Sequence, residues 1–324
     1  MHQVDWLSHF LRMITLTGQL EVHCVYGAPW RVVWPQSAMH EIPYHVVLKG
    51  RAIIEDPETG TTRELAGGEI VLLPHGAAHV LHDGSGHAPR PTHRHRSSGG
   101  WTRSENDGQG ESLDMLCGRF FIEPPHDRLI RNYLPRSLTV RATDSHDEAG
   151  VMSTSNHLAS LVGLMRLESE GDKLGGQVIF NSLSLALFTL ALRAASESEQ
   201  VPAGLLSLAG HPRLAPAISA MFADPIRAWT LPDLADLCSM SRATFMRHFQ
   251  DKLGRSAMEL LTDIRMSMAA NELKKPAMTT EAVADTVGYR SVAAFRRAFA
   301  DKMGMTPGQW RRLARGSEQL GVTV

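Results

Sequence analysis

One residue pattern occurs twice near the C-terminal end of this chain and limits the folds that the chain can adopt. It spans residues 241–252, SRATFMRHFQDK, and returns at residues 291–302, SVAAFRRAFADK. The chain therefore contains two copies of one structural unit. An offset of 50 residues aligns Phe245 with Phe295, Arg247 with Arg297, Phe249 with Phe299, Asp251 with Asp301, Lys252 with Lys302, Gly254 with Gly304 and Ser256 with Thr306.

Each copy is predicted to be a helix-turn-helix. Its two phenylalanines are four residues apart, so they share one face of a helix and point into a core, while the arginine between them points elsewhere. A shorter helix comes before each copy. Thr230 is expected to cap the first of these helices, and Thr280 the second, which covers Glu281–Val287. Gly288 supplies the flexible residue of the second turn. This order of elements is typical of DNA-binding motifs.

One long helix is predicted between the two motifs. Residues 257–274 contain no proline or glycine and are rich in Met, Leu and Ala, and Pro276 follows them. This composition favours a continuous helix that ends before the proline. Two helix-turn-helix motifs on a rigid connector can enter successive major-groove faces of one duplex, whose helical repeat is about 34 Å. A double-stranded DNA operator is therefore the predicted partner.

Residues with characteristic spacings extend over about a hundred positions of the C-terminal half. They are Leu234-Ala235, Ser241, Phe245, Arg247, Phe249, Gly254, Arg265-Met266, Ala269, Leu273, Ala284, Gly288-Tyr289, Phe295, Arg297, Phe299, Gly304-Met305-Thr306-Pro307 and Trp310-Arg311. This set resembles the AraC/XylS family of bacterial transcription regulators. The chain departs from the usual pattern at Tyr289, at Trp310 and at Ala293-Ala294, and the last change bears on which bases are contacted. The resemblance implies RNA polymerase as a further partner.

The family pattern also implies which side chains face the DNA. Arginine can pair with guanine through two hydrogen bonds or hold phosphate, whereas Ala, Val and Met contact thymine methyl groups or fill space. For Arg247 and Arg297, which lie between the paired phenylalanines, a structural salt bridge is the alternative. The implied residues are Arg242, Ala243, Met246 and Arg247 in the first copy and Val292, Ala293, Arg296 and Arg297 in the second.

The distribution of charge agrees with this division of the chain. The formal net charge over 324 residues is only −1. Residues 211–324 hold 16 Lys and Arg against 11 Asp and Glu, a net of +5, whereas residues 1–210 hold 17 against 23, a net of −6. Phosphate contact requires positive charge, and the excess lies in the half that carries the repeat.

Short apolar runs separated by turn residues occupy the chain from Gln19 to about Asp83. Runs of this length with β-branched residues predict a meander or barrel of strands. Residues 68–79, GEIVLLPHGAAH, match the second motif of the cupin family, G-x5-P-x-G-x2-H, and residues 45–50 resemble the end of its first motif. The predicted fold class is therefore α+β, with a cupin-like β-barrel followed by an all-α domain that holds two helix-turn-helix motifs.

Three histidines are candidate metal ligands in the barrel. The usual His-x-His pair and glutamate of the first cupin motif are absent, but His40 and His45 lie nearby, and His79 ends the second motif. These imidazoles could bind zinc or another divalent ion. The alternative is that they are hydrogen-bonded histidines of the core or rim.

Three regions are predicted along the chain: a cupin-like sensor domain at 1–150, a helical dimerisation and linker segment at 151–203, and a DNA-binding domain at 204–324. Residues 83–112 are rich in Gly, Ser, Pro, Arg and His, so they are expected to form a disordered insertion. Amphipathic helices are predicted at 156–168 and 173–195. The second is so apolar that it either contacts another copy in a homodimer or packs against the barrel.

A cytoplasmic protein without a membrane span is expected. Residues 1–16 lack a basic start followed by an apolar run, and the most apolar stretch, 183–192, is shorter than the roughly 20 residues that span a bilayer. Three cysteines, an odd number, do not make a secreted disulfide framework. The chain also contains no motif of a hydrolase or phosphate-binding enzyme, so a catalytic activity is not expected.

The segments around Cys24 and Cys117 resemble those of AraC-type regulators that respond to reactive chlorine species, the RclR type. The resemblance implies a transcription activator that is switched by oxidation of these two cysteines, and a cytoplasmic thiol suits a reversible switch. In one alternative both cysteines are small buried hydrophobes. In another, the barrel binds a small organic effector or a metal ion. Cys238 is predicted to have a packing role.

Overall fold

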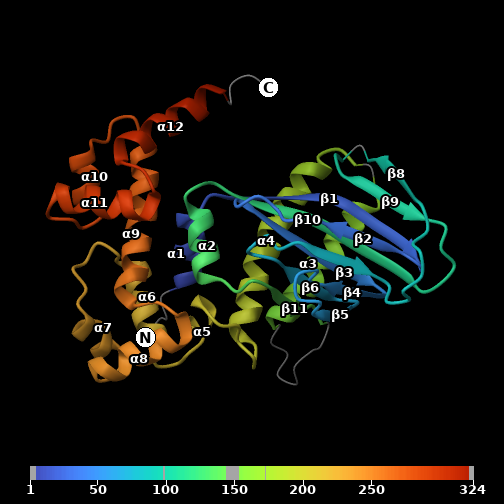
Figure 1. The fold of residues 1–324 in the computed structure, drawn as a ribbon, viewed down its shortest axis with the longest axis horizontal. Helices are drawn as coiled ribbons and strands as arrows, with labels where there is room; N and C mark the ends of the chain where they lie inside the picture. Colours follow the sequence, from blue (N-terminus) through green and yellow to red (C-terminus); the bar gives the residue numbers. More distant parts are fainter. Residues whose placement is uncertain (1–4, 98, 144–152, 172, 321–324) are drawn as a thin grey trace. The chain divides into compact units, whose positions relative to one another are not determined.

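The computed structural model describes residues 5–97, 99–143, 153–171 and 173–320 and divides into two compact units (Figure 1). The sheet unit is Leu16–Pro202, and the helical unit combines Ala203–Val324 with Met1–Thr15. The helix α1 (Trp6–Met13) therefore belongs with the C-terminal residues and not with the domain predicted at 1–150. Trp6 and Phe10 pack on Phe222 of α6 (Ala215–Ala223), with ring centroids 6.2 and 6.0 Å apart.

Two sheets build the sheet unit. The larger has the strand order β11-β6-β3-β10-β1-β9-β8, and the smaller has the order β2-β7-β4-β5. Most neighbouring strands are antiparallel, and β1 pairs in parallel with β9. The strands are β1 (Leu16–Gly27), β2 (Arg31–Trp34), β3 (Glu41–Lys49), β4 (Arg51–Glu55), β5 (Thr62–Ala66), β6 (Glu69–Leu72), β7 (His79–His82), β8 (Thr92–Arg96), β9 (Thr102–Asn106), β10 (Ser112–Ile122) and β11 (Leu138–Arg141).

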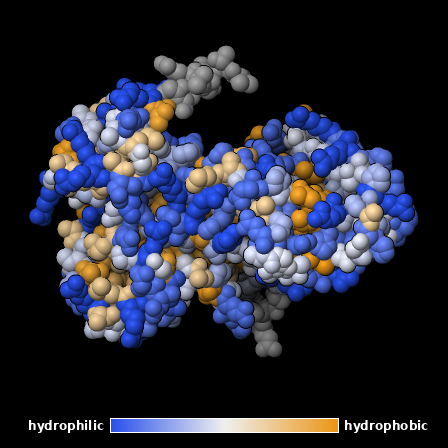
Figure 2. Space-filling view, in the orientation of Figure 1, coloured by the Kyte–Doolittle hydropathy of each residue, from blue (hydrophilic) through white to orange (hydrophobic). Residues whose placement is uncertain are grey.

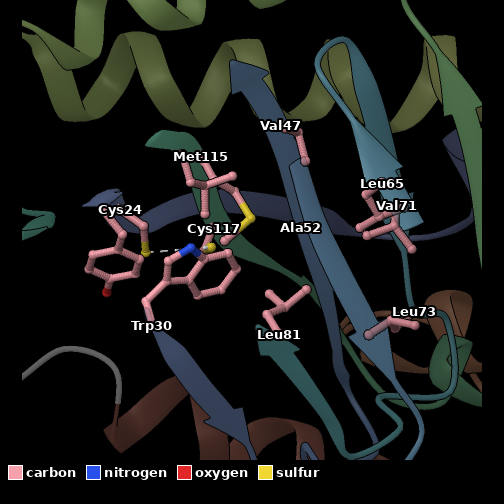
Figure 3. Packing of buried hydrophobic residues seen from close by; sticks show 12 residues of the cluster. Cys24, Trp30, Val47, Ala52, Leu65, Val71, Leu73, Leu81, Met115 and Cys117 are labelled. Atoms are coloured by element: carbon pink, nitrogen blue, oxygen red, sulfur yellow. Dashed lines mark hydrogen bonds between the residues drawn. The ribbon is translucent and has the colours of Figure 1, made fainter. Parts of the chain in front are cut away.

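The core of the sheet unit contains side chains from both sheets, and both cysteines are part of it (Figure 3). Side chains alternate between the two faces of a strand, so Met115 and Cys117 of β10 point into this core. Phe120 points the other way and packs against Phe188 of α4 (Gly176–Glu197), with ring centroids 5.0 Å apart. The motif at residues 68–79 forms β6, a turn with Gly76 at φ 63°, and the start of β7.

Two helices, α3 (Thr154–Ser169) and α4, pack against each other, and α4 also packs on β1. Within the described part of the chain, α4 is the one helix that is long and apolar enough to cross a membrane by length and composition. One side of it is buried on the sheet. The exposed side, together with α3, carries an apolar patch that we call the helical patch: Leu164, Leu167, Val178, Ile179 and Leu185.

Residues 83–112 differ from the expected disordered insertion, because they contain β8 and β9. The prediction was wrong because it rested on the shortage of aliphatic residues in this segment. Two buried contacts order the segment instead. Trp101 is buried against Phe180 of α4, with ring centroids 4.8 Å apart. Ser104 is fully buried and accepts a hydrogen bond from the Tyr26 hydroxyl at 2.7 Å. The short helix α2 (His126–Tyr133), which follows β10, was also not predicted.

The helical unit contains both copies of the repeat, with α9 (Ala257–Lys274) between them (Figure 1). The first helix-turn-helix is α7 (Leu231–Leu237) and α8 (Arg242–Leu253), and the second is α10 (Thr280–Thr286) and α11 (Val292–Met303). The unit also contains α5 (Leu205–Ala209), α6 and α12 (Pro307–Leu320). Hydrophilic residues cover most of the visible surface over α10 and α11 (Figure 2).

Local interactions of the expected kind begin and end these helices. Thr230 and Asp233 form a capping box on α7, and Ser241 and Ser291 cap α8 and α11. The cap of α10 is Thr279, one residue before the predicted Thr280, because the helix already includes Thr280.

The turns of the two motifs use different residues at the same place. Gly288 has φ 80° in the second turn, and Ser239 has φ 50° in the first. A Cβ on Gly288 would lie 2.6 Å from the carbonyl oxygen of Ile226, so glycine is required there for space as well as for conformation. The Arg213 guanidinium donates a 2.8 Å hydrogen bond to the Ser239 carbonyl and holds the first turn.

Candidate sensor site and nucleic-acid interface

The two cysteines of the sheet unit lie side by side in its core. Cys24 on β1 and Cys117 on β10 are 1% and 0% exposed, and their sulfur atoms are 4.0 Å apart (Figure 3). Neither forms a disulfide in this structure. In the strand register Cys24 faces Met115 and Cys117 faces Val22, so the cysteines are diagonal neighbours. The structure thus brings together two residues that are 93 positions apart in the sequence.

A chain of two histidines continues from Cys117. His45 on β3 is the direct cross-strand partner of Cys117, and its Nδ1 lies 3.0 Å from the Cys117 sulfur. The Nε2 atom of His45 lies 2.7 Å from Nε2 of His79 on β7. Nδ1 of His79 lies 2.8 Å from the carbonyl oxygen of Ala77. Trp34 covers both imidazoles, stacked on His79 and edge-on to His45.

The protonation states in this cluster follow from burial and contact. Burial raises the pKa of Cys117 well above its ordinary value, so this residue is a thiol at neutral pH. Contact with the Cys117 thiol lowers the pKa of Cys24, which makes Cys24 the more easily ionised of the two. Burial lowers the pKa of His45, and the neighbouring His79 lowers it further. Burial also lowers the pKa of His79, so both imidazoles are neutral at pH 7.

The histidines do not fit a metal site. His40 is exposed and packs against Phe121, away from His45 and His79. Two nitrogen ligands of one tetrahedral zinc ion, with bonds of about 2.0–2.1 Å, would lie about 3.3 Å apart. The 2.7 Å between the Nε2 atoms is instead a hydrogen-bond length. No group of three His, Cys, Asp or Glu side chains that could hold a metal occurs among the described residues. The alternative interpretation, buried hydrogen-bonded histidines, agrees with the structure for His45 and His79.

The partner that the cluster gives Cys117 was not predicted. His23, which is adjacent to Cys24 in sequence, points to the other face of β1, and its Nε2 lies 2.8 Å from the Asp114 carboxylate. The sequence predicts His45 either as a metal ligand or as a hydrogen-bonded histidine of the core or rim, and neither interpretation names Cys117 as its partner. No local sequence signal could have found this pair, since the contact depends on the register of β3 against β10.

A pocket of about 450 Å³ opens beside the histidine chain. It lies between the β4–β5 hairpin, β6 and the start of β11, and His79, Val71 and Leu73 form part of its wall. Arg63 and Arg136 also line it, as do several hydroxyl side chains. The Asp56 carboxylate lines the pocket as well. A concave site with apolar walls and a few polar groups is typical of small-molecule sites.

The predicted DNA-contacting residues lie on one exposed side of each second helix. On α8 the side chains of Arg242, Ala243, Met246 and Arg247 are exposed, whereas Phe245 and Phe249 are buried in the unit. On α11 the side chains of Ala293, Arg296 and Arg297 are exposed, and Val292 is partly buried against the core of the second motif. The alternation follows from the helical period, which directs the residues between the paired phenylalanines outward.

The arginines of α8 and α11 differ in their partners. Arg296 forms an exposed ion pair with Glu281 of α10, with nitrogen and oxygen 3.0 Å apart. Arg247 and Arg297 have no ion-pair partner among the side chains described in residues 5–97, 99–143, 153–171 and 173–315. The salt-bridge alternative for these two residues is therefore not observed, and their guanidinium groups are free to contact another molecule.

Models of known protein families match both parts of the chain. The cupin family model matches residues 5–197, and a helix-turn-helix domain model matches residues 234–313. The DNA-binding domain of AdpA, solved in complex with a target DNA, is 27% identical and covers 32% of this chain and 95% of its own, with a TM-score of 0.31.

Two curated relatives cover almost the whole chain. The RCS-specific transcriptional activator RclR of Escherichia coli is 28% identical over 96% of this chain and 99% of its own length. The transcriptional regulator MtrA of Neisseria gonorrhoeae is 30% identical over 95% of this chain and 98% of its own. Both are named as transcription regulators, which agrees with the regulator predicted for this chain. The chain therefore belongs to the AraC family of DNA-binding transcription regulators and carries a cupin domain in its N-terminal part.

Proposed function

We propose that this regulator is a cytoplasmic transcription activator whose switch is the oxidation of Cys24 and Cys117. The observation that carries the proposal is the 4.0 Å separation of the two buried sulfur atoms. A disulfide bond is about 2.05 Å long, so a small movement joins them, and the cytoplasm keeps such thiols reduced until an oxidant acts. The name of the relative RclR, an RCS-specific activator, supports the same class of signal.

Joining the sulfurs requires a movement of the strands. Diagonal neighbours on antiparallel strands have Cα atoms about 7–8 Å apart, whereas a disulfide spans about 4.4–6.8 Å. Forming the bond therefore draws β1 toward β10. The strand β1 begins at Leu16, and the residues directly before it belong to the helical unit, where α1 packs on α6. We propose that this covalent continuity carries the signal from the sensor to the helical unit.

Mass spectrometry of the oxidised chain tests this proposal. The reduced full-length protein is treated with one equivalent of hypochlorite, digested without reductant and searched for cross-linked peptides. We expect a linkage between the peptides of Cys24 and Cys117, which a reductant removes, while Cys238 keeps a free thiol. Oxidation of Cys238 or of methionines with both sensor thiols intact would contradict the proposal.

We propose that the exposed sides of α8 and α11 contact the operator, with RNA polymerase as the second partner at the promoter. The positive charge of the helical half and the exposure of Arg242, Arg247, Arg296 and Arg297 support this assignment. Ala243, Met246, Val292 and Ala293 would pack on bases and sugars without hydrogen bonds.

Replacing Arg247 by alanine is expected to weaken operator binding by about 1–3 kcal/mol. The reason is that its guanidinium lies on the exposed side of α8 and forms no ion pair with the side chains that the structure describes. Fluorescence anisotropy with a DNA fragment that the chain itself selects measures the affinity. A salt titration distinguishes a base contact from a phosphate contact, because loss of one phosphate contact lowers the slope of log affinity against log salt concentration by about 1. Arg193→Ala removes the same charge from an exposed position of α4 and is the matched control. Equal operator affinity for Arg247→Ala and the control would show that Arg247 does not contact the operator.

We further propose that the helical patch joins two copies of the chain. Val178 is 69% exposed and Leu167 is 61% exposed, and apolar side chains of this size gathered on adjacent helices are typical of a protein contact. A symmetric dimer would bury the same patch from each copy. It would also place four helix-turn-helix motifs on one operator.

The double substitution Val178→Glu and Leu185→Glu is expected to convert the dimer to a monomer. Both side chains are exposed within one copy, so the added charges should change the stability of the folded monomer little. In a dry interface the same charges lose their hydration, which makes dimerisation unfavourable. Analytical ultracentrifugation measures the mass, and Arg193→Glu on the same helix is the control. A wild-type chain that sediments as a monomer, or a double variant that remains dimeric, would contradict the proposed contact.

The pocket beside His79 favours a second candidate function, control by a small organic anion. Arg63 and Arg136 would bind its negative group, and Ile54, Val71 and Leu73 would contact its apolar part. The two functions differ in one outcome. If a chain with both Cys24→Ser and Cys117→Ser responds fully to hypochlorite, redox sensing is wrong and an effector in the pocket becomes the better hypothesis.

A further inference from the structure

The histidine chain beside Cys117 has one arrangement of protons that satisfies every contact. A carbonyl oxygen only accepts, so His79 Nδ1 carries a hydrogen and donates it to Ala77 at 2.8 Å. A neutral His79 then has a bare Nε2, which accepts from His45 Nε2–H at 2.7 Å. A neutral His45 in turn has a bare Nδ1, and this atom faces the sulfur of Cys117 at 3.0 Å. The Cys117 thiol therefore donates to His45.

The geometry of Cys117 selects His45 over Cys24 as the partner of its proton. The sulfur of Cys24 is 4.0 Å away, whereas Nδ1 of His45 is 3.0 Å away. The side chains of both cysteines and of His45 and His79 are buried, and Trp34 covers the two imidazoles. Cys117 and His45 are both 0% exposed, so a base for the Cys117 thiol has to come from the protein.

We propose that His45 is the proton acceptor that lets Cys117 attack oxidised Cys24, and that His79 holds His45 in the tautomer this requires. The inference rests on the proposed redox function and adds the residues that complete the switch. It assigns to the two cupin histidines a role that involves no metal.

The disulfide forms in two steps, oxidation of Cys24 and attack by Cys117. Hypochlorous acid takes two electrons from the Cys24 thiol, which gives a sulfenic acid and releases chloride and a proton. The sulfur of Cys117 then attacks the sulfur of Cys24: the S–S bond forms, the S–O bond breaks, and the thiol proton of Cys117 moves to Nδ1 of His45. The leaving hydroxide takes this proton and departs as water, so His45 ends neutral. His79 keeps its hydrogen bond to Ala77 throughout and accepts from His45 Nε2–H.

A time-resolved trapping experiment separates the two steps. Reduced full-length chain is mixed with one equivalent of hypochlorous acid and quenched at set times with dimedone, which labels sulfenic acid, and with an alkylating reagent. Mass spectrometry then quantifies labelled Cys24 and the Cys24–Cys117 linkage in the same sample. The Cys117→Ser variant reports the first step alone.

His45→Gln is expected to oxidise at Cys24 as fast as the wild type, to accumulate labelled Cys24, and to form the linkage at least about tenfold more slowly, since general bases contribute about 10²–10⁴-fold. His79→Gln, whose amide oxygen can accept from His45, is expected to link faster than His79→Leu, which gives His45 no acceptor. If His45→Gln fails to fold, the comparison of His79→Gln with His79→Leu still tests whether the histidines assist Cys117.

Two results would overturn the inference, and they are distinguishable. Linkage at the wild-type rate in His45→Gln, or at equal rates in His79→Gln and His79→Leu, would show that the histidines do not assist Cys117 while leaving the redox function in place. An unlabelled and unlinked Cys24 in the wild-type chain would overturn the proposed function itself, and the role of His45 with it.

Discussion

Serine at position 24 or at position 117 is expected to abolish the transcriptional response to hypochlorite. Serine keeps the size of cysteine but has no sulfur to oxidise, and both positions are buried without an ion-pair partner, so the fold and the basal DNA contact should persist. A reporter fused to a promoter that the chain binds measures the response. Induction in the wild type and none in either single variant is the expected result.

Cys238→Ser is the internal control for this experiment. Cys238 lies at the end of α7 in the first helix-turn-helix, and burial raises its pKa, so its thiol is poorly reactive. This variant should retain the full response. Loss of induction in Cys238→Ser, with induction intact in the other two variants, would show that the sensing thiol is Cys238 of the helical unit.

Phe295→Ala is expected to destabilise the helical unit by about 3–5 kcal/mol. Phe295 is fully buried and packs against Phe299, with ring centroids 5.7 Å apart, inside a core that includes Met266, Leu273 and Trp310. The loss combines the transfer free energy of the ring with a cavity that the rigid helices fill poorly. Urea denaturation followed by circular dichroism measures it, and operator binding should fall together with stability.

Phe245→Ala supplies a repeat of this test in the first motif, where Phe245 packs against Phe249 at 5.4 Å. Leu237→Ala is the control, because this side chain is 43% exposed and its removal should change stability by no more than about 0.5 kcal/mol. A Phe295→Ala chain as stable as the Leu237→Ala chain would show that the paired phenylalanines do not form the core of the repeat.

The helical unit could be predicted from the sequence because its determinants are local. The spacing of Phe245 and Phe249 sets the buried face of α8, and serine caps at 241 and 291 set where α8 and α11 begin. The second copy then repeats the evidence of the first. Even here the cap of α10 was placed one residue late, since Thr279 and Thr280 are equally good caps by residue type.

The sensor site could be predicted only in part. Cys24, Cys117, His45 and His79 were each singled out, but their contacts depend on how β1, β10, β3 and β7 align, and strand register is not encoded in any one segment. For the same reason β8 and β9 were missed. The side chains of β8 are exposed and those of β9 are mostly half-buried. The two strands are ordered by backbone pairing, of β9 with β1 and of β8 with β9.

Transcription in a purified system tests whether oxidation of Cys24 and Cys117 switches the regulator. A promoter fragment selected by the chain is transcribed by RNA polymerase with the reduced chain, with the chain after one equivalent of hypochlorite, and with the oxidised chain after reductant. We expect low transcription, high transcription and a return to low transcription, in that order, with the Cys24–Cys117 linkage present only in the second sample. Equal transcription in all three samples, despite a linkage confirmed by mass spectrometry, would contradict this switch.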